Sequence, residues 1–360
     1  MSYGPTRYLT WARQFFGTVT YDLAVSGIPL VGAAELGEPP NRADFAGIER
    51  FSRSIAHYND VPRGEVVPAL GTAHALWLAY ACLASPGDDV LVESPGYEPL
   101  LRAAEGVGAR VVRFERRADE GWALDPDRIA RALTLRTRVV AVTNHHNPTG
   151  VRTPDDRLRA VAAVCQARGV HLLVDEVYSP FDALTDASGV FRGSARKLAP
   201  NIVCAGSLTK CYGLGPHRIG WMLGPPDVIA RAEDVLTCTL GNLPLEHANL
   251  GAHAFSRIDA LATRARLLVE GRREQVAAWM VTRPDLAWSA PSEGLFGLAT
   301  STRSGELLPL LEAAAREQGI LVSPGTFFGV PNGVRVSWAT LGGTQLTEAL
   351  TRLGRLLPPA

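Results

Sequence analysis

The sequence predicts an α/β protein: a mainly parallel central sheet flanked by helices, with a smaller α+β domain. Two observations support this prediction. The 360 residues are 46% hydrophobic and 20% charged, which is enough apolar material for a large core and for about two domains. Short apolar segments also alternate with helix-like segments between residues 72 and 205. Strands separated by helices indicate a parallel sheet that is covered on both faces.

Apolar periodicity and turn signals place the elements of this sheet. The first helix is expected to be buried, because its apolar run stops at Ser85-Pro86-Gly87. A later helix starts at Asp125-Pro126, where an N-cap residue precedes a proline. The expected helices are 72–84, 97–105, 125–134 and 154–167. The expected strands are Asp89–Glu93, Arg110–Phe114, Val139–Thr143, His171–Asp175 and Asn201–Ala205.

The chain changes character after about residue 225. One long helix or two joined helices are expected over 244–282. An α+β tail follows, with strands near 295–299, 319–322 and 333–337 and helices near 305–317 and 343–356. We therefore expect a large α/β domain over 41–245. The N-terminal arm (1–40) and residues 246–360 would form the connecting helix and the small domain.

Composition argues against several functional classes. Lys+Arg and Asp+Glu are both 36, so the chain lacks the basic field of a nucleic-acid or membrane-surface binder. The longest apolar stretch, Ala75–Ala84, is too short to span a membrane. The five cysteines include no CxxC pair, which favours a cytoplasmic protein. His145-His146 lacks metal-ligand spacing, so no metal is expected and the pair is interpreted as loop polarity.

Lysine is rare in this chain. Only Lys197 and Lys210 are lysines, and the other 34 basic residues are arginines. A lysine that persists in such a background is more often kept for chemistry that arginine cannot perform, such as forming an imine. Lys197 lies in a polar stretch and is interpreted as a surface residue. Lys210 instead follows an expected strand, which makes it the candidate nucleophile.

Polar motifs follow the expected strands. Asn144–Gly150 follows the third strand, Asp175 ends the fourth, and Gly206–Lys210 follows the fifth. Gly71-Thr72-Ala73 precedes an apolar helix. Open parallel sheets bind ligands at the carboxyl ends of their strands, so one crevice could collect all four motifs.

Each motif has a physical role if the ligand is a phosphorylated heteroaromatic aldehyde. A helix start with free N–H groups suits a phosphate, and hydroxyl and guanidinium donors would complete that site. A lysine amine forms a Schiff base with an aldehyde, and an aspartate can pair with a protonated ring nitrogen. The phosphate candidates are Thr72, Ala73, Ser207, Thr209 and Arg218. The ring and aldehyde candidates are Lys210, Asp175, Asn147, Tyr178 and Tyr97, the last by stacking on the ring.

The run from Ser207 to Trp221, which contains Ser-x-x-Lys and Arg-x-Gly, resembles the lysine signature of class I/II pyridoxal-phosphate aminotransferases of fold type I. Further stretches are similar to family motifs in the same order, and together they span residues 25 to 340. They are Gly47–Tyr58, Gly71–Leu76, Pro95-Gly96-Tyr97, Asn147–Gly150, Asp175–Tyr178 and Val334–Ser337.

The resemblance implies a cytoplasmic homodimer that binds pyridoxal 5'-phosphate, with active sites near the subunit interface. It would move an amino group between an amino acid and a 2-oxo acid through the Lys210 Schiff base. Arg335 would hold the substrate carboxylate, with Asn147 and Gly27 beside it. The family's tyrosine ahead of the Gly47 helix is absent here. Either its contact with the partner subunit's cofactor phosphate is missing, or Asn41 or Arg42 replaces it.

Two other classes stay open at this stage. The same cofactor site also serves lyases, decarboxylases and cyclases of specialised metabolism, because the fold does not choose the reaction. A non-catalytic sensor is the second, but such sensors carry a DNA-binding domain ahead of the module. The side-chain pocket is expected near the N-terminal arm and Ser323–Phe328, whose phenylalanines suggest apolar or aromatic substrates.

Overall fold

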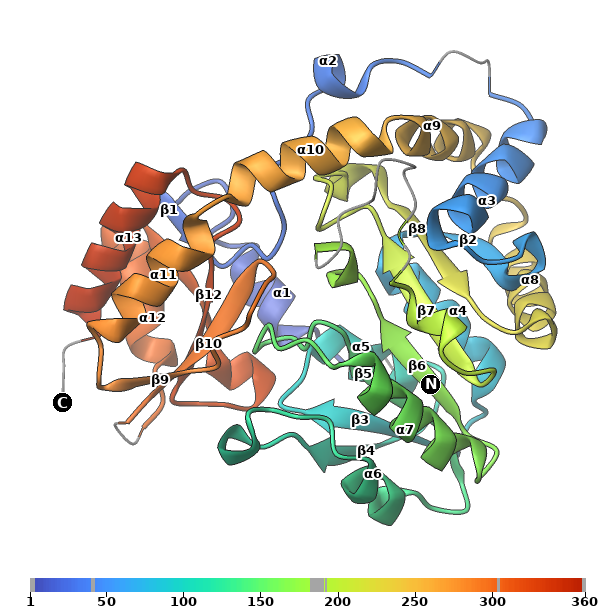
Figure 1. The fold of residues 1–360 in the computed structure, drawn as a ribbon, viewed down its shortest axis with the longest axis horizontal. Coiled ribbons are helices and arrows are strands. Elements are labelled where there is room, and N and C mark those ends of the chain that lie inside the picture. The colour runs from blue at the N-terminus through green and yellow to red at the C-terminus, as the bar shows by residue number, and fades with distance from the viewer. Residues whose placement is uncertain (1–3, 40–42, 182–190, 192, 303–304, 358–360) are drawn as a thin grey trace.

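The computed structural model describes residues 4–39, 43–181, 191, 193–302 and 305–357, which form two sheets with helices packed around them (Figure 1). The larger sheet has seven strands in the order β2-β8-β7-β6-β5-β3-β4. In that order the strands are Val66–Leu70, Ile219–Leu223, Ile202–Ser207, His171–Asp175, Thr137–Thr143, Asp89–Ser94 and Arg110–Glu115. Only β8 runs against its neighbours, so the sheet is mainly parallel, as predicted.

Helices cover both faces of the large sheet. One face packs against α4 (Gly71–Leu83), α5 (Glu98–Gly106) and α8 (Pro226–Leu240). The other face packs against α3 (Ala46–Asn59), α6 (Pro126–Ala132), α7 (Asp155–Gln166) and α9 (Leu245–Ser256). Because both faces are buried, the inner strands are continuous apolar runs such as Val139–Val142 and Leu172–Val174.

The smaller sheet has five strands in the order β1-β11-β12-β10-β9. They are Tyr21–Leu23, Ile320–Pro324, Gly333–Ser337, Phe296–Ser301 and Leu286–Trp288. β1 comes from the N-terminal arm and pairs in parallel with β11, so the arm is built into the C-terminal sheet. Helices α11 (Arg272–Val281) and α13 (Gly343–Leu356) pack on this sheet, and α12 (Leu308–Gln318) precedes β11.

The region 244–282 differs from the expectation. It forms three helices, α9, α10 (Ile258–Val269) and α11, instead of one or two. The first break falls at Arg257, and the second at Glu270-Gly271, where Gly271 has a φ of 70°. A left-handed glycine ends the helical hydrogen-bond pattern at little steric cost, which explains the turn between α10 and α11. Figure 1 shows these helices running from the large sheet to the small one.

Candidate active site

The topology brings the polar motifs to one edge of the large sheet. β5, β6 and β7 are parallel neighbours, and Asp175 pairs with both Thr143 and Ala205. Their carboxyl ends therefore meet. β8 then enters beside them, with Gly220 opposite Ser207 and Ile219 opposite Leu70. This crossing places the start of α4 next to the end of β7.

The first corner of this site is rich in hydrogen-bond donors. The Thr72 hydroxyl donates to Ser207 Oγ at 2.9 Å. The buried Thr209 hydroxyl has no hydrogen-bond partner among the described residues, and no side chain caps the first turn of α4. The exposed Arg218 guanidinium forms no ion pair with any described carboxylate and lies against Gly71. Arg218 Nη1 donates to the Gly215 carbonyl at 3.2 Å, and its positive charge, the Thr209 hydroxyl and the helix start together favour an anion.

Lys210 is partly buried beside this corner. Burial, with Arg335 and Arg218 nearby, lowers the pKa of its ammonium to about 8, while Asp175 opposes the shift. Gly27 packs on it so closely that a Cβ there would lie 3.0 Å from Lys210 Cδ. Ile28 N donates to the Lys210 carbonyl at 3.0 Å. The N-terminal arm thus holds an amine that is neutral at mildly alkaline pH.

Asp175 is the acidic group of the site. It is 2% exposed, and burial raises the pKa of its carboxyl to about 7. One of its oxygens accepts from Val177 N at 3.1 Å. A buried carboxyl with a raised pKa is stabilised as an anion when a cation lies next to it. The adjacent Tyr178 hydroxyl shares a hydrogen bond with Ser26 Oγ at 2.8 Å.

Arg335 lies on the opposite wall, in β12 of the small sheet. Its side chain is fully buried, and Nη1 donates to Asn147 Oδ1 at 2.8 Å. Among the described residues, no carboxylate forms an ion pair with it, and its Nε and the Asn147 amide nitrogen have no hydrogen-bond partner. A buried guanidinium without an ion pair is stabilised strongly when an anion binds next to it.

Tyr97 ends the loop after β3 and is partly buried. Burial raises the pKa of its phenol. Electrostatic interaction with Tyr178, Tyr8 and Asp175 raises this pKa further, and Arg335 lowers it. The structure therefore places Tyr97 near Tyr178, Asp175 and Arg335. Ala73, in the first turn of α4, is exposed.

The loop that carries Asn147 is held by His146. This ring donates to the Pro95 carbonyl through Nε2 at 2.9 Å and shares a bond with Thr149 Oγ1 at 2.7 Å. Burial lowers the pKa of His146. The interpretation of His145-His146 as loop polarity is wrong, since both side chains are buried. The polar groups of a buried loop need hydrogen-bond partners within the protein. His146 provides them both in its own loop, which contains Asn147, and in the loop that contains Pro95.

The other expectations have mixed outcomes. Lys197 is exposed and paired with Asp60 at 3.1 Å, so it is a surface residue as predicted. Asn41 and Arg42 lie outside the described residues. The sequence alone missed Tyr8 and Ser26, whose hydroxyls bond to Arg335 and Tyr178. Neither residue belongs to a recognisable motif, and only the pairing of the N-terminal arm with β11 brings them to the site.

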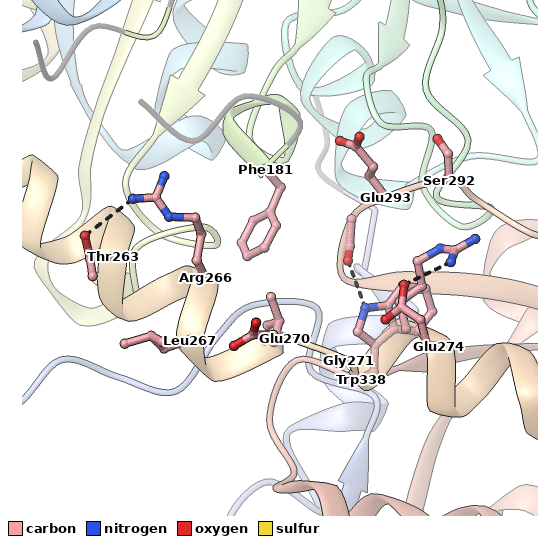
Figure 2. A pocket seen from close by; sticks show the side chains of 13 residues that line it. Phe181, Thr263, Arg266, Leu267, Glu270, Gly271, Glu274, Ser292, Glu293 and Trp338 are labelled. Atoms are coloured by element: carbon pink, nitrogen blue, oxygen red, sulfur yellow. Dashed lines mark hydrogen bonds and ion pairs between the residues drawn. The ribbon is translucent and has the colours of Figure 1, made fainter. Parts of the chain in front are cut away.

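A separate cavity of about 660 Å³ lies between α10 and the loop of residues 292–294 (Figure 2). Its lining includes Phe181 and Trp338 together with charged side chains of both signs, such as Arg266 and Glu270. None of the predicted site residues is among its described lining residues. The mixed charges give this cavity no net attraction for a phosphate, in contrast to the corner at Arg218. None of the helices in the described ranges has the length and apolar character needed to cross a membrane.

Comparison with known proteins agrees with this geometry. The sequence pattern of class I and II aminotransferases matches residues 37–353. The chain is 30% identical to a probable aspartate/prephenate aminotransferase of Thermus aquaticus, over 91% of this chain and 83% of the relative. It is 28% identical to the capreomycidine synthase of Streptomyces vinaceus, over 91% and 88% of the two chains.

The fold is also found among solved structures. A pyridoxal-phosphate-dependent aminotransferase from Streptococcus suis superposes with a TM-score of 0.87, covering 99% of this chain and 98% of that one at 21% identity. The match extends over both sheets, so it includes every element that contributes to the candidate site. The chain therefore belongs to the class I and II aminotransferase family, as an enzyme that uses pyridoxal phosphate to move an amino group between an amino acid and a 2-oxo acid.

Proposed function

We propose that the cluster of Lys210, Asp175 and Arg335 is the catalytic centre, and that its substrates are amino acids bound through their α-carboxylate. The observation that supports this proposal is a partly buried amine with a lowered pKa that lies near a buried carboxyl and a buried guanidinium, the latter without an ion pair to any described carboxylate. Such a perturbed set is typical of a functional site.

The residues present fit pyridoxal phosphate. The phosphate would be held by Arg218, Thr209, Ser207, Thr72 and Ala73. They offer a guanidinium without an ion pair to a described carboxylate, a hydroxyl without a described partner and the start of α4. At the ring, Asp175 would face the nitrogen, while Asn147 and Tyr178 would face the hydroxyl. Asn147 has an unpartnered amide for that purpose. Tyr97 would lie on the ring face and Lys210 would bond to the aldehyde.

When bound, the cofactor supplies an electron sink for the negative charge that develops on the substrate α-carbon. Arg335 binds the substrate carboxylate and so orients the α C–H bond toward Lys210. Lys210 Nζ, in its neutral form, takes the α-proton as a general base. The Asp175 carboxylate would keep the ring nitrogen protonated. Gly27 has no side chain, which leaves space for the Lys210 side chain.

We also propose the organisation of the whole molecule. Residues 41–245 would form the cofactor-binding domain, since every strand of the large sheet lies within them. Residues 1–40 and 246–360 would form the arm, the connecting helices and the small domain. The protein would act as a cytoplasmic homodimer, with the exposed Leu30, Phe45 and Leu267 contributing apolar surface to the contact between subunits.

The amino donor is tested by single-turnover experiments with a panel of amino acids. Each donor alone should give at most one equivalent of 2-oxo acid per active site, and turnover should resume only when a 2-oxo acid acceptor is added. Continued release of ammonia without an acceptor would show a lyase, and absence of any reaction at full cofactor occupancy would favour a sensor.

A cyclase is the second candidate, because the capreomycidine synthase relative covers the chain as fully as the aminotransferase does. In the same experiment a cyclase would consume an amino acid with neither a 2-oxo acid nor ammonia as product. The panel therefore includes an amino acid with a nucleophilic nitrogen in its side chain and a hydroxyl group on its β-carbon, because attack of the nitrogen on that carbon closes the ring and releases the hydroxyl as water.

Substituting Gly71 with alanine is expected to weaken cofactor binding about tenfold. Gly71 has a φ of 78°, and an added Cβ would lie 2.5 Å from Arg218 Nη2, so the guanidinium would have to move away from the phosphate corner. Titration of cofactor-free protein with pyridoxal phosphate measures the effect. Gly17→Ala is the matched control, since Gly17 has a φ of 76° and nothing lies within 4 Å of its added Cβ. Equal affinities for the two variants would contradict the assignment of the corner.

A further inference from the structure

The short helix α1 (Arg7–Ala12) bridges the two halves of the molecule. Figure 1 shows it between the large sheet and the C-terminal elements. Tyr8 N donates to Glu98 Oε2 at 3.1 Å, at the start of α5 in the large domain. The Tyr8 hydroxyl lies 2.9 Å from Ser323 Oγ in β11 of the small sheet. One residue of the N-terminal arm therefore contacts both walls of the active site.

The Tyr8 ring is fixed in place by aromatic neighbours. It is 5% exposed, and its centroid lies 5.8 Å from that of Phe327 and 5.4 Å from that of Phe328. Trp11, one turn further along the chain, packs on Phe327 at 5.4 Å. Helix α1 thus packs on the loop Ser323–Phe328. A substrate near this loop would contact an α1 side chain as well as the phenylalanines.

The Tyr8 hydroxyl is hydrogen-bonded directly to the carboxylate-binding candidate. Arg335 Nη2 donates to it at 3.0 Å, and also to the Ala24 carbonyl at 2.7 Å and Ser323 Oγ at 3.0 Å. These three acceptors are neutral. The Arg335 guanidinium also lies 5.0 Å from the ring centroids of Phe296 and Phe328, which adds only weak compensation for its buried charge.

The Tyr8 hydroxyl can donate its proton to a new acceptor. Because Arg335 donates to the phenol oxygen, the phenol keeps its own proton for another acceptor. Its acceptors are Ser323 Oγ at 2.9 Å and the Ala24 carbonyl at 3.4 Å, both neutral and the second one long. A carboxylate is a stronger acceptor than either, since charge-assisted hydrogen bonds are about twice as strong as neutral ones.

We propose that Tyr8 is a second carboxylate-recognition residue: its hydroxyl donates to the substrate α-carboxylate that Arg335 binds. This inference rests on the proposed role of Arg335 and extends it to a residue outside the two domains' sheets. Because Tyr8 also bonds to Glu98, carboxylate binding would tie α1 and both domains together around the substrate. Through Tyr8, the N-terminal arm would help the enzyme to select amino acids over simple amines.

The test compares Tyr8→Phe with the unsubstituted holoenzyme. The probes are three pairs of compounds that differ only by the carboxylate: L-alanine and ethylamine, L-leucine and isopentylamine, and L-phenylalanine and 2-phenylethylamine. Binding is read from the visible absorbance of the bound cofactor. The variant is expected to bind the amino acids about tenfold more weakly, the loss of one charge-assisted hydrogen bond, and the amines within twofold of the original affinity. For the best donor, KM should rise while kcat changes less than threefold.

Two further variants separate the possible failures. Tyr21→Phe also removes a phenol hydroxyl from the N-terminal arm, but its partner is Glu348, so both classes of probe should bind as before. Arg335→Lys should weaken the amino acids more than Tyr8→Phe does. If Arg335→Lys leaves the preference for amino acids intact, the proposed role of Arg335 is wrong. If only Arg335→Lys reduces that preference, or if Tyr8→Phe weakens amines and amino acids equally, the role of Tyr8 is wrong.

Discussion

Lys210→Ala is expected to abolish covalent attachment of the cofactor and to lower turnover by at least about 10³-fold. The alanine has no amine to bond to the aldehyde and no base to take the α-proton, and each function alone contributes factors of about 10²–10⁴. After treatment with borohydride, mass spectrometry should find the cofactor on the Lys210 peptide of the unsubstituted protein and nowhere in the variant.

Lys197→Ala is the natural control for this experiment, because the chain has only these two lysines. Lys197 is exposed and paired with Asp60, so its loss should leave both trapping and turnover unchanged. Trapped cofactor on Lys197 in the unsubstituted protein would overturn the assignment of the catalytic lysine.

The rate of covalent capture also has a defined pH dependence. An amine attacks an aldehyde in its neutral form, and the pKa of Lys210 is lowered to about 8. Below that pH most of the amine is protonated, so the capture rate should rise about tenfold per pH unit and level off above pH 8. A surface lysine with an ordinary pKa would keep rising to pH 10. Stopped-flow absorbance on cofactor-free protein distinguishes the two profiles.

Asp175→Asn is expected to lower kcat about 10²–10³-fold with little loss of folding stability. The amide preserves the shape of the buried side chain and the acceptor for Val177 N, but it cannot compensate a positive charge. Removing one member of a buried charge pair costs about 3–5 kcal/mol, and about 3–4 kcal/mol of that cost expressed in the transition state corresponds to this loss of rate.

Asp175→Glu tests whether charge is the relevant property. It keeps the carboxylate and displaces it, so it should recover part of the activity that the amide loses. Rates are measured at saturating donor, together with the melting temperature of each variant. If Asp175→Asn retains more than a tenth of the original kcat, the proposed partnership with a protonated ring nitrogen is wrong.

The fold was predictable where packing is repetitive. Both faces of β5, β6 and β7 are buried, so their apolar runs are plain in the sequence, and the expected strands lie within two residues of those observed. β2 and β8 were not predicted. Pro68 interrupts the apolar run of β2, and β8 overlaps the Ser207–Trp221 motif, which was interpreted for its chemistry and not as a strand. The helices after residue 244 were merged because the apolar pattern continues across the break at Arg257.

The candidate site was predictable in its motifs and less so in its contacts. Asp175, Ser207 and Lys210 follow strand ends, where chemistry-bearing residues of a parallel sheet gather. Tyr8 and Ser26 lie on the N-terminal arm, and their place depends on β1 pairing with a strand some 300 residues later. No local pattern encodes such a pairing, so the structure was needed to find them.

The exposed position of Lys197 has a practical consequence. With arginine at the other 34 basic positions, an amine-reactive dye or resin meets a single accessible lysine side chain besides the chain's amino terminus. Conjugates of the loaded enzyme should accordingly be nearly homogeneous. The protein can be immobilised in very few orientations without first being engineered.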